Sequence, residues 1–242
     1  MRAETRHQLK QDRFRQSTLD AAENAAHWTV EHQSKVIVAV IAVVVIAAIA
    51  FGGWYYVNTQ DEKASAELST AVRTYETPVR PAGIPAQPGY DSFGSAQERA
   101  TAARKQFQAI VDQYPRTRTA EMARYFVGLT SEQLGDNAAA ERNLQETANS
   151  SNSDLAALGK FALASVDRAE NKDAQAVDLY KQLIDKPTLT VSKPMAQLEL
   201  ADFYESQKKP DEAKKLYEQI EAENPSTDAS SLARRRAAAL KQ

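Results

Sequence analysis

Residues 200–225 read LADFYESQKKPDEAKKLYEQIEAENP and contain the pattern that decides the fold. Ala213, a small residue, is followed by Tyr217 four residues later and by Ile220 three residues beyond that. Pro225 follows after another five. A small residue lets two helices approach closely, the larger side chains fill the gap to the next helices, and proline ends a helix because it has no N–H to donate. The stretch therefore predicts a helical hairpin.

The same pattern occurs three more times toward the N-terminus. Its small residues are Ala103, Ala140 and Ala176, and the spacings along the series that ends at Ala213 are 37, 36 and 37 residues. A repeat of this length is typical of a solenoid, in which each hairpin buries its apolar face against its neighbours. The chain is therefore predicted to be all-α.

A tight turn is expected before each of the three later small residues. Gly or Asn in the turn readily adopts the left-handed conformation that closes a helix. The aspartates Asp136, Asp173 and Asp211 each offer a side-chain oxygen to cap the helix that follows. The turns have the sequences LGDN (134–137), ENKD (170–173) and KKPD (208–211).

These units resemble the tetratricopeptide repeat family over about residues 97–226. Val127-Gly128, Leu163-Ala164 and Leu200-Ala201 stand where the first helices of that family carry Leu-Gly or Leu-Ala. The resemblance implies a groove, lined by the first helix of each hairpin, that binds protein or peptide segments. Some of the lining side chains are also expected to pack between helices. The residues that the resemblance places toward the groove are Met122, Tyr125, Leu129, Leu158, Phe161, Met195 and Leu198.

Two helical segments flank the clearest repeats. Residues 64–75 are predicted to form the first helix of a further hairpin whose second helix is 97–114, with a Pro-rich loop at 77–94 between them. Residues 228–240 read as a lone final helix with a charged outer face, as the end of a solenoid requires.

An uncharged run, VIVAVIAVVVIAAIAFGGWYYV, occupies residues 36–57. Its 22 residues suffice to cross the roughly 30 Å apolar core of a bilayer as a helix, and the aromatic residues at its far end suit the headgroup layer. Lys35 at the near end favours a cytoplasmic N-terminus, with residues 58–242 outside the cytoplasm. A cleaved signal peptide is the competing interpretation, but the run is longer than the apolar part of such signals.

Residues 1–35 are assigned to a cytoplasmic tail. Phe14, Ala21 and Trp28 fall on one face if the segment is helical. Two interpretations stay open: an amphipathic helix that contacts the membrane or a partner, and a solvated tail without fixed structure.

The composition argues against catalysis. The chain has no cysteine, and its three histidines, His7, His27 and His32, all precede the apolar run. Thiol nucleophiles and cysteine-based metal sites are therefore excluded. The net charge of −2 does not supply the basic surface that nucleic acid needs. The helically spaced carboxylates Asp202 and Glu205 are interpreted as solvated surface groups, so we expect no enzyme, no cofactor or metal, and no nucleic-acid partner.

The order of tail, spanning helix and repeat domain resembles the bacterial family that includes the ancillary subunit of the SecYEG translocon. The resemblance implies an inner-membrane anchor, a periplasmic repeat domain and a chaperone-like role in protein export. The implied partners are the Sec translocon, periplasmic chaperones or exported polypeptides. The alternative is a static scaffold in an envelope or cell-division assembly.

Overall fold

The computed structural model describes residues 33–85 and 88–240. Within these ranges it contains nine helices and no strand, which confirms the prediction of an all-α chain. The helices are α2 (Gln33–Glu76), α3 (Ala96–Gln113), α4 (Arg118–Gln133), α5 (Asn137–Ala148), α6 (Ser153–Ala169), α7 (Asp173–Asp185), α8 (Lys193–Ser206), α9 (Pro210–Glu223) and α10 (Asp228–Ala239).

The chain divides into two units between Tyr56 and Val57. In the described part of the first unit, α2 is long and apolar enough to cross a membrane, and its most apolar stretch is not buried in the protein. Ile37, Ile46 and Phe51, for example, are 50–70% exposed. Such exposure of a continuous apolar helix is expected where lipid rather than protein surrounds it. The two interpretations of the N-terminal tail, and its three histidines, concern residues 1–32, which lie outside the described residues.

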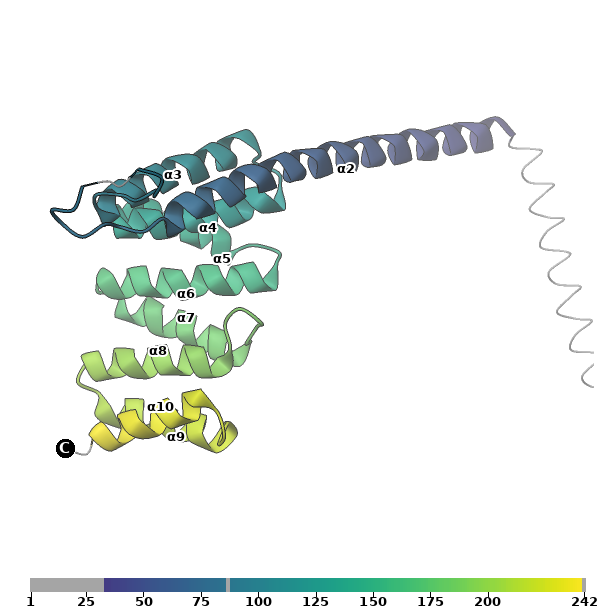
Figure 1. The fold of residues 1–242 in the computed structure, drawn as a ribbon. Helices are drawn as coiled ribbons and strands as arrows, with labels where there is room; N and C mark the ends of the chain where they lie inside the picture. Colours follow the sequence, from purple (N-terminus) through teal and green to yellow (C-terminus); the bar gives the residue numbers. More distant parts are fainter. Residues whose placement is uncertain (1–32, 86–87, 241–242) are drawn as a thin grey trace, which may run out of the picture. The chain divides into compact units, whose positions relative to one another are not determined.

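The second unit stacks α3 to α10 in the order of the sequence, as Figure 1 shows. The four small residues of the repeat pattern (Ala103, Ala140, Ala176 and Ala213) are all 0% exposed. The larger side chains four residues later (Phe107, Leu144, Tyr180 and Tyr217) are at most 1% exposed. Burying a large apolar side chain stabilises the fold by about 1.5–3 kcal/mol, so these positions supply much of the packing energy.

The end of α2 forms the first hairpin with α3. Ala64 and Ala71 are fully buried in one cluster with Ala103 and Phe107, and Tyr75 packs against this cluster. Its ring meets that of Phe107 edge-on at a centroid distance of 6.3 Å. The contacts confirm the expected pairing of residues 64–75 with the helix that follows the loop.

The Pro-rich loop between α2 and α3 is closed at its base. The Arg80 N–H donates to the Phe93 carbonyl, and the Phe93 N–H donates to the Pro78 carbonyl, each at 3.0 Å. The Arg80 guanidinium also donates to the Ser92 carbonyl. The long connection therefore leaves and re-enters the helical stack at a fixed point.

The helix caps only partly follow the sequence prediction. Asp136 caps α5 by accepting a hydrogen bond from the Ala139 N–H at 3.2 Å. The predictions for Asp173 and Asp211 were wrong, because both aspartates lie inside the first turn of their helices. The residues before these helices are Lys172 and Lys209, and neither makes a side-chain cap. The negative charges still favour the helix N-termini through the helix dipole.

Left-handed residues close the preceding helices, but not all are of the expected type. Gly135 has φ 75° and Asn171 has φ 61°, as predicted. In the third turn Lys208 takes this conformation, with φ 57°. Lysine bears a steric cost there that glycine does not.

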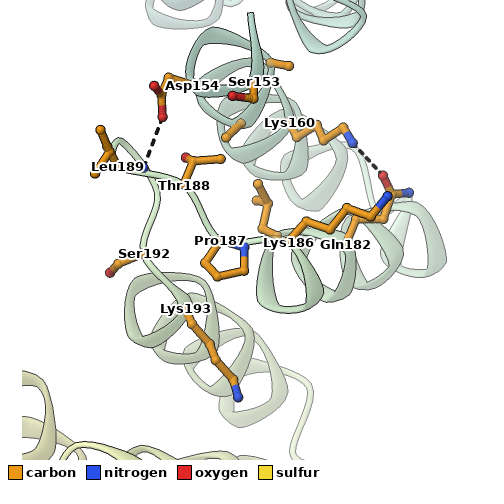
Figure 2. A pocket seen from close by; sticks show the side chains of 13 residues that line it. Ser153, Asp154, Lys160, Gln182, Lys186, Pro187, Thr188, Leu189, Ser192 and Lys193 are labelled. Carbon is orange, nitrogen blue, oxygen red and sulfur yellow. Dashed lines mark hydrogen bonds between the residues drawn. The ribbon is translucent and has the colours of Figure 1, made fainter. Parts of the chain in front are cut away.

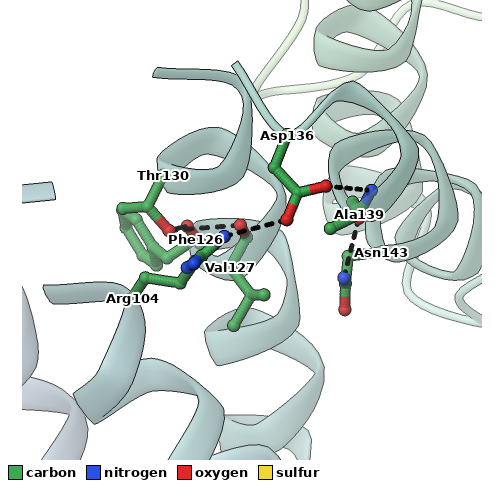
Figure 3. A network of polar contacts seen from close by, with 7 residues as sticks. All are labelled: Arg104, Phe126, Val127, Thr130, Asp136, Ala139 and Asn143. Atoms are coloured by element: carbon green, nitrogen blue, oxygen red, sulfur yellow. Dashed lines mark hydrogen bonds and ion pairs between the residues drawn. The ribbon is translucent and has the colours of Figure 1, made fainter. Parts of the chain in front are cut away.

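A polar network ties α3 to the α4–α5 turn (Figure 3). The second carboxylate oxygen of Asp136 accepts from the Arg104 guanidinium at 3.1 Å. On α4, the Thr130 hydroxyl donates to the Phe126 carbonyl. Asp136 thus caps the start of α5 and also forms an ion pair with Arg104 of α3.

Asp202 and Glu205 are partly exposed, and they also bind a tyrosine of the next helix, which the sequence interpretation did not foresee. The Tyr217 hydroxyl lies 2.9 Å from Asp202 Oδ1 and 2.5 Å from Glu205 Oε1, and its single proton is shared between these acceptors. Burial and these two hydrogen bonds raise the pKa of Tyr217. The pair therefore joins α8 to α9.

Candidate protein-binding surface

The first helices of successive hairpins carry all seven residues that the sequence places toward a groove. Among these helices, α4 contacts α6, and α8 contacts α10. We call the exposed side of α4, α6, α8 and α10 the first-helix face. Met122, at the start of this series on α4, is half-buried.

Tyr125 and Leu129 on α4 pack together against one apolar cluster. Both are half-buried, and their neighbours include Leu144 and Leu163. The Tyr125 ring also meets Phe126 edge-on at 5.4 Å. Burial raises the pKa of Tyr125. These two side chains therefore contribute to packing between α4, α5 and α6, and only their outer parts are free to meet a partner.

Leu158 and Phe161 on α6 belong to a different cluster. They are half-buried against residues of α7 and α8. The Phe161 ring lies edge-on to Tyr180, with centroids 6.0 Å apart. Tyr125 and Leu129 on α4, and Leu158 and Phe161 on α6, therefore pack between helices, as was expected of some of the groove residues.

Met195 and Leu198 on α8 line a pocket of about 410 Å³ between α8 and α10. Met195 is 43% exposed, and Leu198 packs with its inner side against the cluster around Tyr217. We call this cavity the α8–α10 pocket. It brings together two of the seven predicted residues, whereas the other five do not line it.

The α10 wall of this pocket was not predicted. It consists of Asp228, Ala229, Leu232 and Arg235. The sequence analysis treated this helix as a charged cap, yet Ala229 and Leu232 are three residues apart, the spacing that puts two side chains on one helical face. That spacing was the sequence signal from which an apolar face on α10 could have been predicted.

Charged groups frame the apolar wall. Glu199 and Arg235 line the α8–α10 pocket together with Asp228. Glu199 also pairs with Arg168 of α6 at 3.4 Å, and the Arg168 guanidinium lies 5.1 Å from the centre of the Phe203 ring. A polar rim around an apolar centre is the usual anatomy of a protein-binding site.

The chemistry of the described residues offers no metal centre, because residues 33–85 and 88–240 contain no group of three or more His, Asp or Glu side chains able to hold an ion. The surface instead offers apolar side chains, adaptable methionine and a few charges. This arrangement suits binding of a polypeptide segment.

Comparison with protein-family models agrees with the geometry. The model of the tetratricopeptide repeat-like domain matches residues 26–186, which is more than half of the chain. A tetratricopeptide repeat model matches residues 195–227. A search of curated proteins found no match. The chain therefore belongs to the tetratricopeptide repeat-like family.

Proposed function

We propose that this protein is a membrane-anchored, chaperone-like module that binds polypeptide segments on its first-helix face. Tetratricopeptide repeat domains are modules of protein–protein interaction, and that general role is the basis of the proposal. The single observation that carries it further is the α8–α10 pocket, in which Met195 is exposed beside a second apolar helix face.

The apolar character of the pocket favours partners that expose hydrophobic side chains. Methionine adapts its shape to different neighbours, so one such surface accommodates several sequences. Newly exported polypeptides present such segments before they fold. The resemblance in domain order to the ancillary translocon subunit family supports the same class of partner, at the Sec translocon or with periplasmic chaperones.

The proposed topology has residues 1–35 in the cytoplasm, residues 36–57 in the bacterial inner membrane and residues 58–242 in the periplasm. Lys35 on one side and Trp54 with its neighbouring tyrosines on the other support this orientation. A reporter that is active only in the cytoplasm, fused after Gln242, should therefore be silent. An active reporter contradicts the topology.

Site-specific photo-crosslinking in native membranes tests the function. With benzoylphenylalanine at Met195, we expect adducts with many exported polypeptides, seen as a broad range of masses. The matched control position is Lys215, which is exposed on α9 and does not line the α8–α10 pocket. Equal adducts from both positions contradict a binding surface at Met195.

The same experiment separates the proposal from the scaffold alternative. A chaperone-like protein binds many unfolded clients weakly, whereas a scaffold binds one folded partner. A single adduct of defined mass from Met195 would favour the scaffold. Neither outcome involves catalysis, and we propose a non-catalytic role in both cases.

A further inference from the structure

A second pocket, of about 840 Å³, lies between the start of α6, the end of α7 and the start of α8 (Figure 2). We call it the α6–α8 pocket. It shares only Ser192 with the α8–α10 pocket, so the two are separate sites. Ala157, Leu183 and Pro187 form its apolar part. Its volume falls in the range of about 300–1,000 Å³ that is typical of ligand sites.

The charged side chains that line the α6–α8 pocket are predominantly lysines. Lys160, Lys186 and Lys193 line it, together with one carboxylate, Asp154, although the Lys193 side chain points away from the other two lysines (Figure 2). Lys193 is paired with Glu223 at 2.7 Å. Lys160 donates to the neutral amide of Gln182 at 2.9 Å. Among the described residues, neither Lys160 nor Lys186 forms an ion pair, so two positive charges at this pocket are uncompensated.

The Asp154 carboxylate is not in an ion pair with these lysines among the described residues. It accepts a hydrogen bond from the segment between α7 and α8 instead. Its Oδ1 accepts a hydrogen bond from the Leu189 N–H at 3.0 Å, and its backbone carbonyl accepts from the Thr190 hydroxyl at 2.7 Å. The Gln182 amide in turn donates to Asp178 at 2.7 Å, so that carboxylate is also engaged. These hydrogen bonds leave the carboxylates charged, but Lys160 and Lys186 against the single lining carboxylate of Asp154 still give the pocket lining a net positive charge.

The segment that forms the mouth of the pocket is held in one shape. The Thr188 N–H donates to the Val191 carbonyl at 3.0 Å, and the Val191 N–H donates to the Thr188 hydroxyl at 3.2 Å. Val191 is 0% exposed, which anchors the segment in the core. Between these fixed points Leu189 is 96% exposed. A well-ordered segment thus presents an apolar side chain to solvent at the mouth of the pocket, at the end away from the amines of Lys160 and Lys186 (Figure 2).

We propose that the α6–α8 pocket binds an acidic peptide segment in which a carboxylate side chain is followed closely by a large apolar residue. Lys160 and Lys186 receive the carboxylate as charge-assisted hydrogen-bond donors. Leu189 and the apolar part around Pro187 cover the neighbouring side chain. Charge complementarity selects this occupant, because a neutral or basic segment leaves both lysines without a partner.

The test uses the full-length chain in lipid nanodiscs and an array of short, end-blocked peptides. Each peptide places one or two glutamates shortly before a leucine in a Gly–Ser background. Matched arrays carry glutamine or lysine in place of glutamate. We expect the best glutamate peptides to bind at least about ten-fold more tightly than their glutamine counterparts. Raising the NaCl concentration should weaken their binding.

Variants assign this binding to the pocket. Lys160→Gln with Lys186→Gln should lower affinity about ten-fold, and Leu189→Ser should lower it independently. The matched control, Lys181→Gln with Lys215→Gln, removes the same charge from two exposed lysines that do not line the pocket. It should leave affinity nearly unchanged. Unchanged melting temperatures of all variants verify that the fold is kept.

Three outcomes overturn the proposal: no glutamate peptide binds, the glutamate and glutamine arrays bind alike, or the control pair loses as much affinity as the pocket pair. The last result indicates attraction to overall charge. Met195→Ala should not affect the acidic peptides, since Met195 belongs to the other pocket. If this proposal fails, the proposed function at the first-helix face is unaffected, because photo-crosslinking from Met195 tests it separately.

Discussion

Asp61 on α2 accepts a hydrogen bond from the backbone N–H of Thr119 on α4 at 2.9 Å, across 58 residues of sequence. The Thr117 side chain accepts from the next N–H, that of Ala120, at 3.0 Å. An oxygen from α2 and an oxygen from the N-cap residue Thr117 therefore satisfy two donors in the first turn of α4, where backbone N–H groups have no partner within the helix. This contact fastens the first hairpin to the second.

Replacing Asp61 with alanine should lower the free energy of unfolding by about 0.5–2 kcal/mol, the usual cost of losing a helix cap. The matched control is Glu62→Ala, because Glu62 is exposed and accepts a hydrogen bond from Asn58 on its own helix. Urea unfolding of the full-length chain in detergent measures both. Equal stability of the two variants would show that the contact contributes nothing.

Gly159→Ala should destabilise the chain more than Gly128→Ala. A Cβ at Gly159 would lie 2.5 Å from the Ala148 backbone nitrogen and 2.8 Å from the Thr147 carbonyl carbon. At Gly128 it would meet the Leu144 side chain, at 2.6 Å. Backbone atoms have less freedom to move than a side chain. In the Gly159→Ala variant, α5 and α6 must therefore move apart to make room for the added Cβ.

Alanine in a helix interior is better than glycine by about 1 kcal/mol, which opposes the loss from the clash. We expect a net loss of roughly 1–3 kcal/mol or more at Gly159 and a smaller one at Gly128. Thermal unfolding of both variants gives the comparison. If the Gly159→Ala variant has the same melting temperature as the parent protein, the close approach of α5 and α6 at this position is contradicted.

Asp167→Asn should stabilise the chain at neutral pH. Asp167 is 2% exposed and its Oδ1 has no hydrogen-bond partner. Burial raises its pKa above 3.8, against the effect of Lys172, while Glu141 and Glu170 add to the rise. Because the folded chain holds this proton more tightly than the unfolded chain, the stability of the parent falls as the pH rises from about 3.8 through the raised pKa.

The asparagine variant lacks this titration, so its advantage over the parent should grow across that interval. The advantage should reach the order of 1 kcal/mol, since a buried charge without a direct partner is costly. Urea unfolding at a series of pH values measures it. Asp185→Asn, at an exposed position on α7, is the control and should run parallel to the parent. A parallel profile for Asp167→Asn would refute the prediction.

The helical pairs were predictable because their signals are local. A small residue such as Ala140 and a large one four positions later, Leu144, share a helix face whatever the rest of the chain does. Both are 0% exposed. The role of Asp61 could not be predicted, since no local pattern reveals a partner 58 residues away. Likewise, no residue preference predicts lysine for the left-handed position of Lys208.

The candidate site was less predictable than the fold. Periodicity places Tyr125, Phe161 and Met195 on first helices, but the exposed fraction of each depends on how neighbouring helices stack. Met195 is 43% exposed at the α8–α10 pocket, whereas Phe161 has the Tyr180 ring against it. The spacing of Ala229 and Leu232 was a local signal for an apolar face on α10, but that this face lies against α8 is seen in the packed structure.

The last prediction concerns Tyr125, Phe161 and Met195 as partner contacts. The sequence analysis places Tyr125 and Phe161 toward the groove, where an exposed side chain could be replaced at little cost in stability. Both are half-buried, so we now expect each alanine substitution to cost about 1.5–3 kcal/mol and to lower the melting temperature by several degrees. Met195→Ala, at 43% exposure, should cost less than about 1 kcal/mol.

Partner contact is read out separately, as the yield of adducts from benzoylphenylalanine at Leu232, across the pocket from Met195. Met195→Ala should lower this yield by at least about ten-fold if it is an anchor worth about 1.4 kcal/mol or more. Leu200→Ala is the control for stability, since Leu200 is 2% exposed and its loss should cost about 2–5 kcal/mol. If Met195→Ala leaves both the melting temperature and the adducts unchanged, the α8–α10 pocket is not the partner site, because its most exposed apolar side chain then contributes nothing to contact.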